Sequence, residues 1–166
     1  MIVLRLIHIG SAVFWAGSAF FLVSYLTPAV QAAGPEGAKV MQRIALSSFP
    51  KVVPALGGLT VLAGLLMYWR DSGGLQLAWI TTPTGLGFTF GGLMGLTSLI
   101  IGLTVTAPAI NRMADILRES MAAKRPPTPE QMKEIPALQV KMTNAAVWNS
   151  IFLALAILGM ATARYL

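Results

Sequence analysis

The chain has 166 residues, of which 55% are apolar and only 11% are charged. An ordinary soluble domain carries about 25% charged residues, and a soluble chain of this size could not cover its surface with so few charges. The same composition excludes an intrinsically disordered chain, which would be polar. We therefore predict an integral membrane protein that contacts the lipid bilayer.

Residue counts exclude or disfavour several functions. Without any cysteine, the chain has no disulfide, no thiolate metal site and no c-type haem motif. The net charge of +6 does not indicate a nucleic-acid partner, because the cations lie in loops beside apolar segments. All 6 acidic residues also lie in loops, whereas ion-coupled transporters usually place carboxylates at membrane depth. No set of catalytic residues is recognisable.

Four segments are long and apolar enough to cross a bilayer, namely residues 2–26, 52–69, 84–106 and 145–165. The first is longer than the apolar region of a signal peptide, so we interpret it as a membrane helix. The expected fold is all-α, a single transmembrane domain over residues 1–166 that forms a four-helix bundle.

The first and third segments are expected to end at similar tetrapeptides, Thr27-Pro28-Ala29-Val30 and Ala107-Pro108-Ala109-Ile110. Each tetrapeptide precedes an amphipathic segment and another span, which is the order of a parallel two-plus-two duplication. A chance match at four positions explains the similarity nearly as well.

The loop charges predict the orientation of the bundle. Loops 29–51 and 109–143 hold nine of the 12 Lys and Arg residues. The positive-inside rule then places these loops in the cytoplasm and both termini outside, as expected in a bacterial inner (plasma) membrane. The loops themselves are expected to contain amphipathic helices, one over residues 36–45 and another that starts at a capping box over residues 128–131.

Polar and aromatic side chains recur along the first span with alternating spacings of three and four residues. This spacing places them on one helix face, which should point into the bundle because lipid cannot satisfy polar groups. The residues on this face are His8, Ser11, Trp15, Ser18, Leu22 and Tyr25.

His8 is the candidate ligand for a haem iron or a copper ion near the outer face. Met67 and Met160 are predicted at a comparable depth and could supply a thioether ligand, which suits copper(I) and some haems. Arg5 lies one turn outside His8, where it could pair with a haem propionate or a lipid phosphate. Ser11 and Trp15 would border the same site. The alternative is a structural histidine that joins two helices and holds no cofactor.

Small residues mark the faces that are expected to pack. Their close spacing lets helix backbones approach one another in lipid. This interpretation predicts a tight bundle, whereas the alternative is a homodimer face or a cavity for a flat ligand. The residues are Gly10, Gly17, Ser24, Gly57, Gly64, Gly91, Gly95, Ser98 and Gly102.

A second polar group lies on the inner half of the fourth span. Amide side chains at this depth form hydrogen bonds between helices or line an inner cavity. The group consists of Asn144, Trp148, Asn149 and Ser150.

The segment from Leu6 to Phe21, followed by Pro28, resembles the opening helix of CopD-like membrane proteins. Leu6-Ile7-His8 matches a Leu-x-His start and Trp15-Ala16-Gly17 a Trp-x-Gly centre. HemJ-type protoporphyrinogen oxidases and small uncharacterised four-helix membrane proteins open similarly. The resemblance implies copper handling or haem b binding, with His8 as ligand. Since His8 is the only histidine, a second ligand would come from a methionine or from His8 of a second chain.

Three functions remain open from the sequence. The first is a haem- or copper-binding membrane protein, with a role in electron transfer or metal handling. The second is a structural or accessory subunit that has no cofactor and packs in a homodimer or against other membrane subunits. The third is a homo-oligomeric transporter of a small solute, formed around the glycine-rich third span.

Overall fold

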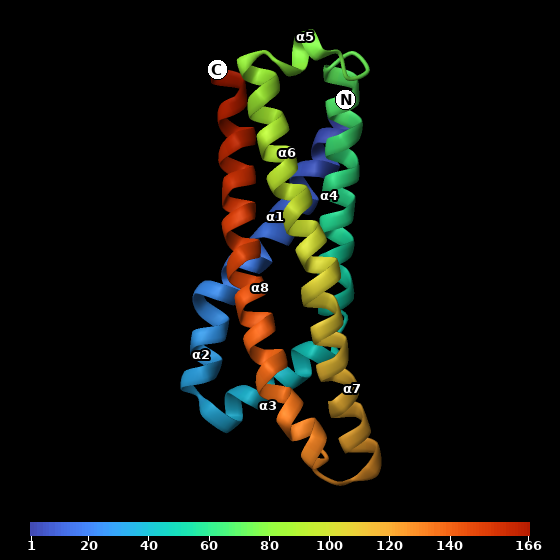
Figure 1. The fold of residues 1–166 in the computed structure, drawn as a ribbon, viewed down its shortest axis with the longest axis vertical. Helices are drawn as coiled ribbons and strands as arrows, with labels where there is room; N and C mark the ends of the chain where they lie inside the picture. Colours follow the sequence, from blue (N-terminus) through green and yellow to red (C-terminus); the bar gives the residue numbers. More distant parts are fainter.

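The computed structural model describes residues 1–166 as four long helical rods joined by turns, with no strand (Figure 1). Two rods contain π-helical segments. In chain order the elements are α1 (Ile2–Phe21), η1 (Leu22–Leu26), α2 (Thr27–Ala32), α3 (Gly34–Leu46), α4 (Phe49–Asp71), α5 (Leu77–Ile80), α6 (Pro83–Ile101), η2 (Gly102–Thr106), α7 (Ala107–Ala123), α8 (Pro129–Thr162) and η3 (Ala163–Tyr165).

Four helices are long and apolar enough to cross a membrane, which confirms the predicted all-α class and the number of candidate spans. The shortest is α4, whose 23 residues extend about 34 Å at 1.5 Å per residue, slightly more than the hydrocarbon core of a bilayer. Both termini lie near one end of the bundle, the terminal end, and α3 and the α7–α8 turn lie at the other, the hairpin end (Figure 1).

The outer surface of the rods is apolar, and only 19 of 166 residues are buried. Ile2, Val13, Phe14 and Leu62 are among the large side chains that are more than half exposed. A soluble monomer rarely exposes apolar patches of this extent. This surface is the one that a bilayer would cover.

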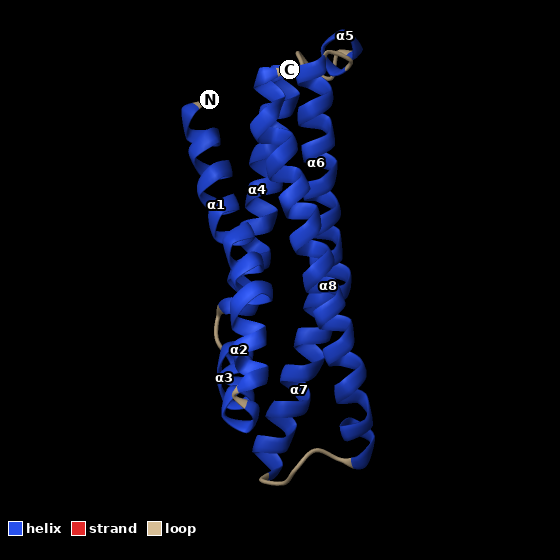
Figure 2. Cartoon of the chain, turned by 90° about the vertical axis from the view of Figure 1, so that its left-hand side faces the viewer, coloured by secondary structure: helices blue, strands red, loops and turns tan.

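The long rods pack mainly as two pairs, α1 with α4 and α6 with α8. Near the terminal end, α1 stands apart from α6 and α8 (Figure 2). The pairs meet deeper in the bundle, where Trp15 and Ala16 of α1 form a buried cluster with Leu153 of α8.

The small residues of α6 make close contact with α8, as predicted. A Cβ atom built on Gly91 would lie 2.7 Å from the Cγ of Met160, and Gly95 faces Ala156. Ser98 is fully buried and donates a hydrogen bond to Asn149 of α8. Gly102 is the exception, because no side chain or neighbouring backbone lies within 4 Å of its built Cβ.

The predicted packing face of the first span is only partly correct. Gly10 and Gly17 are exposed, with nothing within 4 Å of a built Cβ, and Ser24 is exposed as well. On α4, by contrast, Gly57 and Gly64 both contact α1. Glycine spacing identified a packing face on α4 but not on α1, because the face that α1 presents to α4 holds larger side chains.

The prediction that Thr27-Pro28 ends the first helix is wrong, because the rod continues to Ala32. The segment η1 lies just before this pair, and the amide of Thr27 donates to the carbonyl of Leu22, five residues back. The segment η2 repeats this geometry before Pro108, where the amide of Ala107 donates to Gly102. A proline ring clashes with the carbonyl four residues earlier, and a π-turn lets the helix continue past it.

The π-turn also explains why the predicted polar face ends early. Ser11 and Trp15 are buried and Leu22 is half-buried, but the side chain of Tyr25 is 69% exposed. A π-turn holds more residues than an α-turn, so the phase of the face is shifted beyond Leu22.

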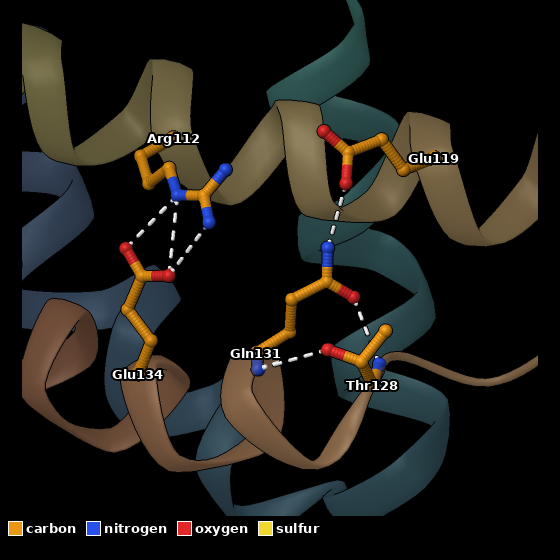
Figure 3. A network of polar contacts seen from close by, with 5 residues as sticks. All are labelled: Arg112, Glu119, Thr128, Gln131 and Glu134. Carbon is orange, nitrogen blue, oxygen red and sulfur yellow. Dashed lines mark hydrogen bonds and ion pairs between the residues drawn. The ribbon is translucent and has the colours of Figure 1, made fainter.

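The loop helices follow the predicted pattern. The helix expected over residues 36–45 is α3, and α8 begins with the expected capping box between Thr128 and Gln131. The hairpin of α7 and α8 is closed by polar contacts on facing helices (Figure 3). Arg112 donates three hydrogen bonds to the carboxylate of Glu134, at 2.8, 2.9 and 3.2 Å, and Gln131 donates one to Glu119.

Candidate functional site

The polar face of α1 packs directly on small residues of α4. His8 lies against Gly64, where a built Cβ would be 2.9 Å from the imidazole Cε1. One turn deeper, the hydroxyl of Thr60 donates to the hydroxyl of Ser11 across 2.8 Å. The Trp15 ring lies against Gly57, 2.8 Å from a built Cβ. Close approach at the two glycines brings polar groups of the two helices together.

The imidazole of His8 has one defined partner. Its Nδ1 lies 2.8 Å from the backbone carbonyl oxygen of Thr60. Because a carbonyl only accepts, Nδ1 carries the hydrogen, and the Nε2 of the neutral ring keeps a free lone pair. Metal-binding histidines commonly donate their other ring nitrogen to a carbonyl in this way, which sets the tautomer and the ring orientation.

Ser11 and Trp15, predicted to border a cofactor, are buried in the seam between α1 and α4. Ser11 also donates to the carbonyl of Ile7 in its own helix. Both residues hold the two helices together one and two turns below His8. Their contacts therefore fix the depth at which the imidazole meets α4.

Arg5 is exposed at the terminal end, one turn beyond His8. Arg70 and Arg164, at the same end, are exposed as well, and none of the three arginines forms a salt bridge within the chain. These guanidinium groups are available for anionic groups such as lipid phosphates or carboxylates.

The structure separates the two candidate methionine ligands. Thr60, Gly64 and Met67 follow one another at helical spacing, so Met67 lies on the stripe of α4 that faces α1, one turn beyond Gly64. Met160 instead packs on Gly91 in the α6–α8 pair. Met67 is therefore the better placed to approach His8.

Within the chain, no three His, Asp or Glu side chains are grouped so that they could hold a metal ion. With a single histidine and no cysteine, a centre on His8 would take its remaining ligands from methionine, from a second copy of the chain or from outside the protein. The free Nε2 could supply the first ligand of such a centre.

The second polar group, on α8, is divided by the structure. Asn149 points inward and accepts from Ser98, whereas Asn144 and Trp148 are exposed. Asn149 also borders a cavity between the helices. Sequence reasoning considered an inner cavity but missed most of its walls, because they come from residues far apart in the chain.

No protein-family model, no curated protein and no solved structure matches this chain. The resemblance of residues 6–28 to the CopD-like opening helix therefore stays a prediction.

Proposed function

We propose that this protein binds a transition-metal centre, haem b iron or copper, through the Nε2 of His8 near the terminal end of the bundle. The hydrogen bond from His8 Nδ1 to the carbonyl of Thr60 is the observation that supports this most directly. It fixes the hydrogen on Nδ1 and leaves Nε2 as the nitrogen that can bind a metal.

The residues around His8 fit such a centre. Thr60 orients the ring, and Gly64 gives it space against α4. Met67, on the same stripe of α4, offers a thioether that suits copper(I). A haem would be held by His8 together with Met67 or the His8 of a second copy, and Arg5 would pair with a propionate. Either metal supplies one-electron redox chemistry when it is bound.

The proposal includes the position of the site in the cell. The concentration of Lys and Arg at the hairpin end supports a cytoplasmic location for α3 and the α7–α8 turn. The His8 site would then lie near the outer face of a bacterial plasma membrane.

Absorption spectra of detergent-purified protein, oxidised and dithionite-reduced, test the haem form. We expect a Soret band in the wild type after haem is supplied, and its loss in His8→Ala. For copper, we expect retention of about one copper(I) per chain after dialysis and its loss in the same variant. The control is Met94→Leu on α6, which keeps the bound metal.

The proposal is overturned if the wild type retains neither haem nor copper(I), or if His8→Ala retains them as well as the wild type. Comparison with Met67→Leu and Met160→Leu then identifies the second ligand. We expect only Met67→Leu to weaken copper binding.

The second candidate is a structural or accessory membrane subunit without a cofactor. It is favoured by the same contact, because the hydrogen bond to Thr60 already gives His8 a partner across the α1–α4 seam. In this case the protein would be metal-free and would co-purify with other membrane subunits. His8→Ala would then lower only the stability of the fold. The transporter alternative is less favoured, because Gly91 and Gly95 of the third span pack against α8 of the same chain.

A further inference from the structure

A cavity of about 120 Å³ lies between the helices toward the hairpin end of the bundle. All four rods contribute to its wall, which contains no charged residue. Trp15 and Phe49 bring aromatic rings, Asn149 and Thr106 bring polar groups, and Gly102 leaves open space beside them. This cavity lies deeper in the bundle than His8, and His8 is not among its lining residues.

Both π-turns contribute to this cavity. Leu22 is the first residue of η1, and Gly102 and Thr106 are the first and last residues of η2. In most other parts of the rods the helices are regular. π-Turns are rare and are frequently found at functional sites, and here both of them border one space.

The hydroxyl of Thr106 is buried without a hydrogen-bond partner. Nearby threonines of the same rod, Thr97 and Thr104, each donate to the carbonyl four residues back. For Thr106 that carbonyl belongs to Gly102, which accepts the amide of Ala107 in the π-turn. A buried hydroxyl without a partner is costly in a membrane. Thr106 lines the cavity, so rotation of its side chain would bring this hydroxyl to an acceptor on a ligand.

Asn149 lines the same space and can supply a second donor. Its Oδ1 accepts the hydrogen bond from Ser98, which orients the amide so that Nδ2 keeps its two hydrogens without a partner in the chain. The cavity thus combines an apolar, aromatic wall with two donors and no charge.

We propose that this cavity is a binding site for a small neutral ring compound that carries a carbonyl group, the class of aromatic ketones and quinone rings. The absence of charge in the wall selects a neutral molecule, because an ion would be buried without a counter-charge. An enclosed engineered cavity of about 150 Å³ binds benzene, and this cavity of about 120 Å³ is partly open, so a substituted ring can extend beyond it. The carbonyl accepts from Thr106 and Asn149, while Trp15 and Phe49 contact the ring.

Two glycines of one continuous rod offer a matched test. Gly102 and Gly92 both have nothing within 4 Å of a built Cβ, so a side chain fits at either position. Only Gly102 borders the cavity. Leucine at Gly102 would therefore fill the space, whereas leucine at Gly92 would point to the outer surface.

The experiment is saturation-transfer NMR of the full chain in lipid nanodiscs, with acetophenone as the probe and ethylbenzene as the probe without a carbonyl. Empty nanodiscs give the signal from partition into lipid. We expect saturable binding of acetophenone to the wild type, to Gly92→Leu and to His8→Ala, and none to Gly102→Leu. Thr106→Val keeps the shape of the side chain but removes the hydroxyl. It should lower the affinity for acetophenone by about fivefold and leave the affinity for ethylbenzene unchanged.

Binding that is not saturable in the wild type, or equal binding to Gly102→Leu and Gly92→Leu, overturns the proposed site. An unchanged preference for acetophenone in Thr106→Val overturns the assignment of a carbonyl ligand. Circular dichroism of each variant confirms that the bundle is folded. Because His8→Ala is expected to bind the probe normally, the outcome is independent of the metal proposal.

Discussion

The Nδ1 of His8 lies 2.8 Å from the carbonyl oxygen of Thr60, and this contact joins the first two spans at the depth of the only histidine. Thr60 uses its hydroxyl at the same time to contact Ser11 one turn deeper on α1. A single residue of α4 therefore sets both the tautomer of His8 and the register of the two helices.

The close approach of α1 to α4 predicts a sharp difference between two adjacent glycines. Gly57→Ala places a methyl group 2.8 Å from the Cε2 of Trp15, which should lower the free energy of unfolding by about 1–3 kcal/mol. Gly58→Ala meets nothing within 4 Å and should not lower it. Unfolding of both variants in mixed micelles of increasing SDS content measures this, and equal stabilities would contradict the observed packing.

The hydrogen bond between Ser11 and Thr60 should be detectable as a coupling energy. In a double-mutant cycle of Ser11→Ala and Thr60→Val, we expect the two side chains to be coupled by about 0.6–2 kcal/mol, the range of hydrogen bonds between membrane helices. Ser11→Ala with Thr97→Val is the control pair, because Thr97 bonds only within its own rod. A coupling as small as that of the control would mean that the hydroxyls do not interact.

The orientation of the bundle can be tested without removing native thiols, since the chain has no cysteine. We introduce single cysteines at Lys124, in the turn at the hairpin end, and at Leu77, which is 75% exposed on α5. The positive-inside rule predicts that a membrane-impermeant maleimide labels only Leu77→Cys in intact cells. Inverted vesicles should show the opposite pattern. Labelling of Lys124→Cys from outside would reverse the proposed orientation and place His8 near the cytoplasm.

The α7–α8 hairpin should be less stable at acidic pH. The hydrogen bonds from Arg112 lower the pKa of Glu134 below its ordinary value, and the positive charge of Arg112 acts in the same direction. A lowered pKa stabilises the closed hairpin fully above the ordinary glutamate value of about 4.3. This stabilisation is lost as the pH falls through the lowered pKa.

Hydrogen–deuterium exchange of α7 and of the first turns of α8 measures this loss of stability. We expect faster exchange as the pH falls below about 4.3, after correction for the intrinsic exchange rate. Glu134→Gln should already exchange faster at neutral pH and lose most of the pH dependence, whereas Glu130→Gln should keep it. Identical profiles for the two variants would show that the pair with Arg112 does not hold the hairpin.

The features that depend on local pattern could be predicted from the sequence. The four spans follow from the length of the apolar segments, and the capping box at Thr128 from the spacing of two side chains. The packing face at Gly91, Gly95 and Ser98 follows from helical periodicity. His8, Ser11 and Trp15 could be placed on one face for the same reason, because an α-helix repeats every 3.6 residues.

Tertiary structure decided the rest, since periodicity does not say which helix lies opposite a given face. Only the packing of α1 on α4 gives His8 the carbonyl of Thr60 as a partner. The same packing places Met67 on the helix that contacts His8, whereas Met160 lies in the other helix pair. The π-turns before Pro28 and Pro108 interrupt the regular repeat, which explains why Tyr25 leaves the predicted face. The cavity at Thr106 exists because four rods that are distant in sequence meet around those turns.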